Sequence, residues 1–122
     1  MLRGALIGES LRVGGMLSGV PLRVIRIWRE EAPGATADQP RHWTLIEFEA
    51  DEADARPLAT ALAGQLASTG GWYVDFRTGI ETFVVFAGRV FRYPRGDARG
   101  RAEAQAYARA IGVPEPQLDW LD

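Results

Sequence analysis

The 122-residue chain has no cysteine, no lysine, no asparagine and only one histidine. The lack of cysteine excludes disulfides, thiolate zinc sites and cysteine nucleophiles. A single histidine excludes a multi-histidine metal site within one chain, so we expect neither a metal nor another cofactor. All 14 basic residues are arginine. Because a G+C-rich coding sequence depletes lysine and asparagine together, this abundance of arginine gives only weak support to anion recognition.

Excess positive charge and long apolar runs are missing as well. The formal net charge is −2, which argues against nucleic-acid binding, because that binding rests on a surplus of basic side chains. The apolar run Ala5–Ile7 stops at Gly8 and is too short for the core of a signal peptide. No stretch approaches the roughly 20 apolar residues of a membrane span. We therefore expect a cytoplasmic protein with no nucleic-acid partner and no membrane partner.

What is present is the composition of one globular domain, with 47% hydrophobic residues and 25% charged residues. Residues 1–20 hold five glycines, and we expect an irregular arm there with one short strand at Ala5–Leu11. Residues 21–122 form a single α+β domain that includes a docked tail at 113–122. The tail keeps Leu118 and Trp120, which are too apolar to remain in water.

Alternating and β-branched segments predict five strands in the domain, over Leu22–Glu30, His42–Glu49, Trp72–Arg77, Glu81–Phe86 and Arg89–Tyr93. The first helix begins after Asp54, buries leucines spaced four apart at 58, 62 and 66, and ends at Gly70–Gly71. Asp97 caps a second helix that runs to Ile111, with Gly112 as its stop.

The resulting order, β-β-α-β-β-β-α, predicts a two-layer α+β sandwich. A mainly antiparallel sheet of about five strands would carry both helices on one face, as in a ferredoxin-like fold. The stretches GWYVDF, ETFVVFAGRVFRYPRGD and GVPEPQLDW resemble a group of small uncharacterised bacterial proteins over about residues 20–122. This resemblance implies a single compact domain and brings no activity or site residue with it.

Two predicted strands are apolar on both faces, and helices on one face could not cover all of that surface. The candidate interface residues are Val24 and Trp28 in the first strand and Val84 and Phe86 in the fourth. Either the N-terminal arm and the tail cover these side chains, or another subunit does. We expect a homodimer that forms through this sheet face.

Candidate acid–base residues are Tyr73, Asp75, Glu81 and His42. Tyr73 and Asp75 share one face of a strand with Arg77, and Glu81 lies just across a turn. A phenol, two carboxylates and a guanidinium could form a catalytic site. The same set is typical of a solvated strand face, and a lone histidine near a strand end is more often structural.

Arg92 and Arg95, ahead of the second helix, are candidate anion ligands, because a helix N-terminus offers free N–H groups. Asp97 at the cap position would take those N–H groups and repel an anion. We therefore expect a small binding or protein-interaction module that associates with itself. A metal-independent enzyme and a phosphate-binding protein are the alternatives, and the small-molecule ligand is unknown.

Overall fold

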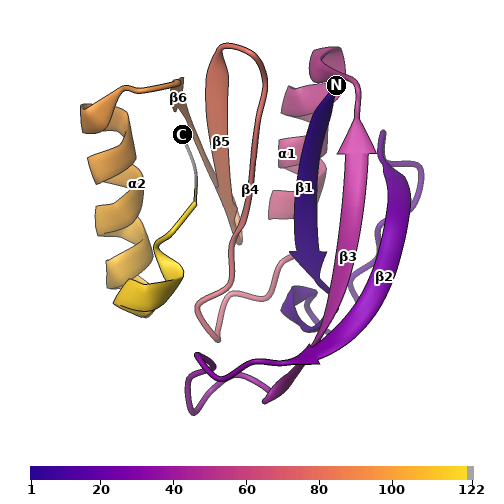
Figure 1. The fold of residues 1–122 in the computed structure, drawn as a ribbon, viewed down its shortest axis with the longest axis vertical. Coiled ribbons are helices and arrows are strands. Elements are labelled where there is room, and N and C mark those ends of the chain that lie inside the picture. Colours follow the sequence, from indigo (N-terminus) through magenta and orange to yellow (C-terminus); the bar gives the residue numbers. More distant parts are fainter. Residues whose placement is uncertain (121–122) are drawn as a thin grey trace.

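The computed structural model describes residues 1–120, and its strands form one six-stranded antiparallel sheet in the order β2-β3-β1-β4-β5-β6 (Figure 1). The strands are β1 (Leu2–Ile7), β2 (Arg23–Glu31), β3 (His42–Ala50), β4 (Val74–Arg77), β5 (Glu81–Phe86) and β6 (Arg89–Pro94). The helices are α1 (Ala55–Ala63) and α2 (Ala98–Ala110), with 3-10 turns η1 (Gly8–Ser10), η2 (Glu52–Asp54) and η3 (Glu115–Gln117). The α+β class is confirmed, and the sheet has six strands where about five were expected.

The additional strand is β1, which overlaps the short strand expected at Ala5–Leu11 but begins at Leu2 and ends at Ile7, so the expected irregular arm does not extend over residues 2–7. β1 lies in the middle of the sheet, paired along its length with β3 and joined to β4 at Gly4↔Phe76. Leu2 and Leu6 are buried in the core. Gly4 is required by packing, since a Cβ atom there would lie 2.6 Å from Cζ of Phe48. Gly4 therefore allows the ring of Phe48 to approach the backbone of β1 closely.

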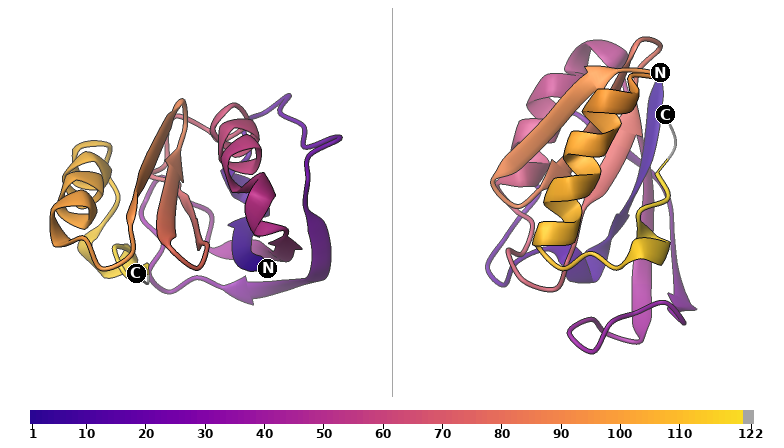
Figure 2. Two further views of the ribbon diagram at one scale, coloured as in Figure 1. Left: turned by 90° about the horizontal axis from the view of Figure 1, so that it is seen from above. Right: turned by 90° about the vertical axis from the view of Figure 1, so that its left-hand side faces the viewer.

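The two helices lie on opposite faces of the sheet, not on one face. The sheet curves around α1, and α2 lies on the other side of β5 and β6 (Figure 2). Along β5, Phe83 and Val85 belong to the core on the α1 side, whereas Val84 and Phe86 belong to the core on the α2 side. Successive strand residues point to opposite faces, so one helix on each face is what a doubly apolar strand requires. The ferredoxin-like order is not confirmed.

Helix α1 begins after Asp54 as expected but ends at Ala63, earlier than Gly70. The residues beyond it bond to the chain that follows β1. The N–H of Arg12 donates to the carbonyl of Gln65 at 2.8 Å, and the N–H of Ala67 donates to the carbonyl of Ser10 at 2.7 Å. These partners replace helical hydrogen bonds, and Gly64 favours the break because glycine is a poor helix former.

Helix α2 and the tail together cover one half of their sheet face. The carboxylate of Asp97 accepts the N–H of Arg99 at 3.1 Å, so the predicted cap is confirmed, and Gly112 ends the helix with φ at +95°. Trp120 is 3% exposed, and its indole N–H donates to the Tyr93 hydroxyl at 2.9 Å. Trp120 belongs to the core cluster that includes Tyr93 of β6 and Ala104 and Ala108 of α2, while Leu121 and Asp122 lie outside the described residues.

Strand β2 forms one edge of the sheet and contains a β-bulge between Val24 and Arg26. The extra residue, Ile25, shifts the alternation, so Val24 shares a face with Ile27 and not with Trp28. Within residues 1–120, no helix is long and apolar enough to cross a membrane.

Candidate functional site

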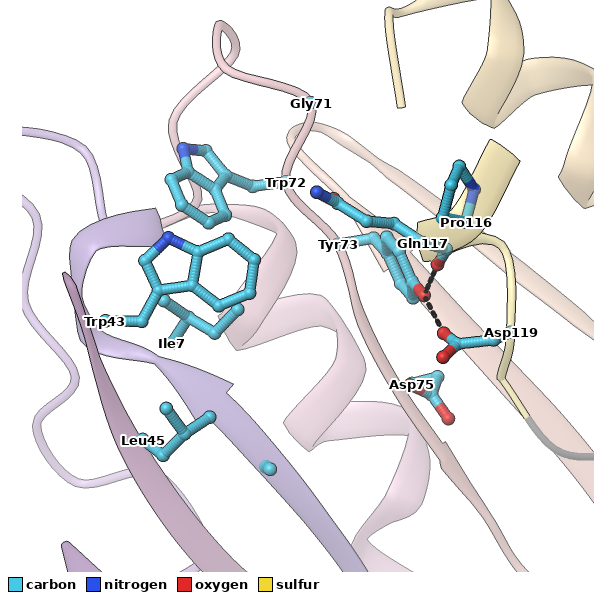
Figure 3. Close-up of a pocket in the computed structure, with 11 residues that line it drawn as sticks. Ile7, Trp43, Leu45, Gly71, Trp72, Tyr73, Asp75, Pro116, Gln117 and Asp119 are labelled. Carbon is cyan, nitrogen blue, oxygen red and sulfur yellow. Dashed lines mark hydrogen bonds between the residues drawn. The ribbon is translucent and has the colours of Figure 1, made fainter. Parts of the chain in front are cut away.

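Within residues 1–120, the face that carries α2 is covered only over β4, β5 and β6, and we call it the half-open face. Its uncovered part is built from alternate residues of β1, β3 and β2, which include Ile7, Trp43, Leu45 and Trp28. A pocket of about 250 Å³ lies where this uncovered part meets β4 and the tail (Figure 3). Its lining residues come from four separate segments, namely Ala5, Ile7, Trp43, Leu45, Gly71, Trp72, Tyr73, Asp75, Pro116, Gln117 and Asp119.

Aromatic rings form opposite sides of the pocket. On one side, Trp43 and Trp72 meet edge to face with ring centroids 5.6 Å apart, and the Trp43 indole N–H donates to the Pro40 carbonyl at 2.9 Å. On the other side, the ring of Tyr73 lies 5.3 Å from that of Trp120 (Figure 3 shows Tyr73 across the pocket). Each ring is fixed by a neighbouring ring or a hydrogen bond, so the walls are formed in the absence of a ligand.

The tail supplies the rim and is fastened to two loops by polar contacts. The amide of Gln117 donates to the Gly34 carbonyl at 2.9 Å and to Oε1 of Gln39 at 3.0 Å. Gln39 is buried and donates in turn to the Gly70 carbonyl at 2.7 Å. These bonds connect η3, the loop between β2 and β3, and the loop before β4. The docked tail therefore forms one side of the pocket and is bonded to both loops.

Two carboxylates, Asp75 and Asp119, lie at one end of the pocket beside the Tyr73 hydroxyl (Figure 3). That hydroxyl donates to the Gln117 carbonyl and approaches Oδ1 of Asp119 at 3.5 Å. Burial raises the pKa of Tyr73 well above its usual value, and the charges of Asp75 and Asp119 raise it further. Tyr73 is thus a hydrogen-bond donor at neutral pH and not a base.

The carboxylate of Asp75 is half-buried and pairs with the guanidinium of Arg77. Burial raises the pKa of Asp75, and the hydrogen bond and positive charge of Arg77 offset only part of that rise. Asp119 is exposed, and its approach to Tyr73 is long for a hydrogen bond. Asp119 is therefore the carboxylate of the two that is better able to meet a ligand.

Glu81 and His42 do not join this group. The register Arg77↔Thr82 places Glu81 with Phe83 on the α1 face, where it accepts a hydrogen bond from Nη2 of Arg92 at 3.0 Å. His42 is exposed at the start of β3 and lines a different hollow beside Glu31. Of the four acid–base candidates, the structure brings together only Tyr73 and Asp75.

The two arginine candidates for anion binding are also separated. Arg92 pairs with Glu81 on the α1 face. Nη1 of Arg95 donates instead to the Thr78 carbonyl at 3.3 Å. At the start of α2, the carboxylate of Asp97 already accepts a backbone N–H. This arrangement is that of a capped helix with paired arginines at its approach.

The interface candidates fall into two groups. Val84 and Phe86 are fully buried beneath α2 and the tail, which corrects the expectation that they lie on an open surface. Val24 is 52% exposed and Trp28 is partly exposed, but the bulge places them on opposite faces of β2. They cannot form one patch on a sheet face, because a strand presents alternate residues to each face.

Several pocket residues were not anticipated from the sequence. Trp43 and Leu45 alternate on a strand, and this spacing could have marked them as a second apolar face. Gln117 and Asp119 carried no such signal, since their position depends on how the tail docks.

No family model, curated protein or solved structure matches the chain.

Proposed function

We propose that this protein is a non-catalytic binding module whose ligand site is the pocket on the half-open face. The observation that carries the proposal is the set of fixed aromatic walls, Trp43 with Trp72 on one side and Tyr73 on the other, next to two carboxylates. Concave sites with apolar and aromatic walls and a few polar groups are typical of ligand binding.

The ligand class follows from the chemistry of the walls. Aromatic faces attract cations and flat apolar groups, and carboxylates attract cations. Asp75 is already paired with Arg77, whereas Asp119 is exposed. Asp119 is therefore the carboxylate that a ligand in the pocket would meet. The pocket would therefore accept an organic amine with an aromatic or apolar body, either as a small molecule or as a side chain of another protein.

A catalytic role has less support. A general base must be free to accept a proton at working pH. Tyr73 is held protonated, Asp75 is occupied by Arg77, and Glu81 and His42 lie elsewhere. The enzyme and anion-binding alternatives, the homodimer and the cytoplasmic location stay predictions from the sequence.

The test is a titration of the ¹⁵N-labelled protein with three probes that share a phenyl group. Phenethylamine is cationic, 3-phenylpropanol is neutral and 3-phenylpropionate is anionic at neutral pH. We expect phenethylamine to shift the indole N–H signals of Trp43 and Trp72 most, the alcohol less and the acid least. Asp119→Asn should remove most of the preference for the amine over the alcohol.

A matched pair of variants locates the binding site. Ala5→Phe places a ring in the pocket and should abolish the shifts, whereas Ala106→Phe adds the same ring on the exposed side of α2 and should leave them unchanged. Equal responses to all three probes, or shifts that survive Ala5→Phe, would overturn the proposal.

A further inference from the structure

Strand β2 combines a free sheet edge with unusual apolar exposure. It is the outermost strand next to β3, as Figure 1 shows at the right of the sheet. Val24, Ile25 and Ile27 are 52%, 41% and 61% exposed. An edge strand with exposed apolar side chains is a template for pairing with another strand, and β2 pairs with β3 in a regular register from Arg26 to Glu31.

The backbone groups that point outward along this edge follow from the pairing with β3. The N–H of Ala32 donates to the carbonyl of Arg41 at 2.8 Å, so Ala32↔Arg41 is a hydrogen-bonded pair. In an antiparallel ladder such pairs alternate, so Arg26, Trp28 and Glu30 also direct their backbone groups toward β3. The N–H and C=O groups of Ile27, Arg29 and Glu31 therefore point away from the sheet.

Charges along β2 are arranged in a self-complementary order. Arg23 and Arg26 lie in its first half, and Glu30 and Glu31 end it. In an antiparallel pair of two such strands, Arg26 of each can lie opposite Glu30 of the other, while Arg29, in the second half, lies opposite Ile27. A parallel pair would place like charges opposite each other, which is destabilising.

We propose that β2 pairs antiparallel with β2 of a second copy of this chain, centred on Trp28. In this register Ile27 and Arg29 of one copy form hydrogen-bonded pairs with Arg29 and Ile27 of the other. Arg26 lies opposite Glu30 at both ends, and the two Trp28 side chains are neighbours on the half-open face. The product is one continuous twelve-stranded sheet.

The neighbouring registers are less favourable. Centring on Ile27 would require the backbone of Ile25, which the bulge removes from the regular ladder. Centring on Arg29 would place two arginines directly opposite each other. The register centred on Trp28 avoids both problems and uses only the regular segment from Arg26 to Glu30.

The test measures the mass of the full chain by sedimentation from micromolar to millimolar concentration. We expect a dimer whose dissociation constant rises at least roughly tenfold in either Arg26→Glu or Glu30→Arg, because each places like charges opposite each other. An equimolar mixture of the two variants should restore association, since the mixed pair places opposite charges together at both ends.

A backbone variant tests the hydrogen bonds separately. Arg29→Pro removes an outward N–H while leaving every bond to β3 in place, so it should yield a monomer. Arg29→Ala keeps that N–H and should remain a dimer. Circular dichroism and thermal melting verify that each variant is folded.

A wild-type monomer at millimolar concentration would overturn the proposal, as would a dimer that survives both Arg29→Pro and the charge variants. The outcome is independent of the pocket. Ala5→Phe should leave the dimer intact, and Arg29→Pro should leave phenethylamine binding intact.

Discussion

Strands β5 and β2 each contain four large apolar residues, but these residues lie in opposite environments. In β5, Phe83 and Val85 pack under α1 while Val84 and Phe86 pack under α2, and all four are at most 1% exposed. In β2, the apolar side chains on both faces remain largely in solvent. The apolar pattern is therefore not sufficient to identify a covered strand.

The two strands differ in their number of charged residues. β5 has one charged residue, Glu81, at its first position, whereas β2 has three arginines and two glutamates among nine residues. Charged side chains on an edge are a common means of limiting unwanted pairing, and they also select a partner with the complementary order. A strand that is apolar on both faces and carries charged residues along its length indicates an edge strand. A strand that is apolar on both faces and has few charged residues indicates a central strand.

The largest expected loss of stability comes from removing the tail, which covers one face of β5. Truncation after Gly112 deletes Val113, Leu118 and Trp120, which are all buried against the sheet and α2. We expect the free energy of unfolding to fall by at least about 3 kcal/mol, as for loss of a buried tryptophan. Denaturant unfolding of both chains measures this, with the exposed tail variant Pro116→Ala as the control. Equal midpoints for the full and truncated chains would show that the tail is not part of the core.

One substitution made at both strands tests the comparison directly. Val84→Thr places a hydroxyl in a dry core and should cost about 1–3 kcal/mol. Val24→Thr makes the same change at a position 52% exposed and should cost within about 0.5 kcal/mol. Urea unfolding of the two variants measures the difference. Similar costs at the two positions would mean that β2 is covered in solution.

A substitution at the start of α2, the helix that covers one face of β5, should have a smaller effect on stability. Asp97→Ala removes the acceptor for the Arg99 N–H and should cost about 0.5–2 kcal/mol. Asp97→Ser keeps a capping oxygen and should retain most of the stability. Thermal unfolding compares the three proteins, and a melting temperature unchanged by alanine would contradict the capping role.

Asp75 lies at the boundary between the covered and uncovered halves of the half-open face. We expect its contribution to the free energy of unfolding to depend on pH. Burial raises its pKa above the usual 3.8, so the folded state binds the proton more tightly than the unfolded state. This contribution to stability is complete below pH 3.8 and is lost as pH rises through the raised pKa. The stability of the wild type relative to Asp75→Asn should therefore increase as pH falls from 7 toward 3.8.

Urea unfolding at several pH values checks this sign, and Asp38→Asn, at an exposed loop position, is the control. A difference between the wild type and Asp75→Asn that stays constant with pH, or that shrinks in acid, would contradict the assignment.

Local sequence signals predicted most elements because those elements depend on nearby residues. The β-branched and aromatic residues at 42–49 identified β3, and Asp97 identified the start of α2. The strand expected at Ala5–Leu11 overlaps β1 only at Ala5–Ile7, because Gly4 disfavours a strand locally, while its close packing against Phe48 is a long-range contact. The faces of the helices were missed because alternation shows that β5 is apolar on both sides but not what covers each side.

The candidate site was predictable only in part, for the same reason. Tyr73 and Asp75 share a strand face, which period two predicts. Glu81 was grouped with them because it lies just across the turn, but the register Arg77↔Thr82 places it on the other face. A shift of one residue reverses the face, and turn geometry sets that shift. Asp119 and Gln117 reach the pocket only through docking of the tail.

The central position of β1 has a consequence for the order of folding. β1 precedes β3 and β4 in the chain, yet it is enclosed only when both have been made, and Phe76, which pairs with Gly4, comes much later in the sequence. Strand pairs so distant in sequence form only after a long loop has closed. The entropy of that closure is lost before any contact energy is gained, which slows folding. Until β4 arrives, a nascent chain carries β1 as an unpaired edge, so incomplete chains should be the species most prone to aggregate.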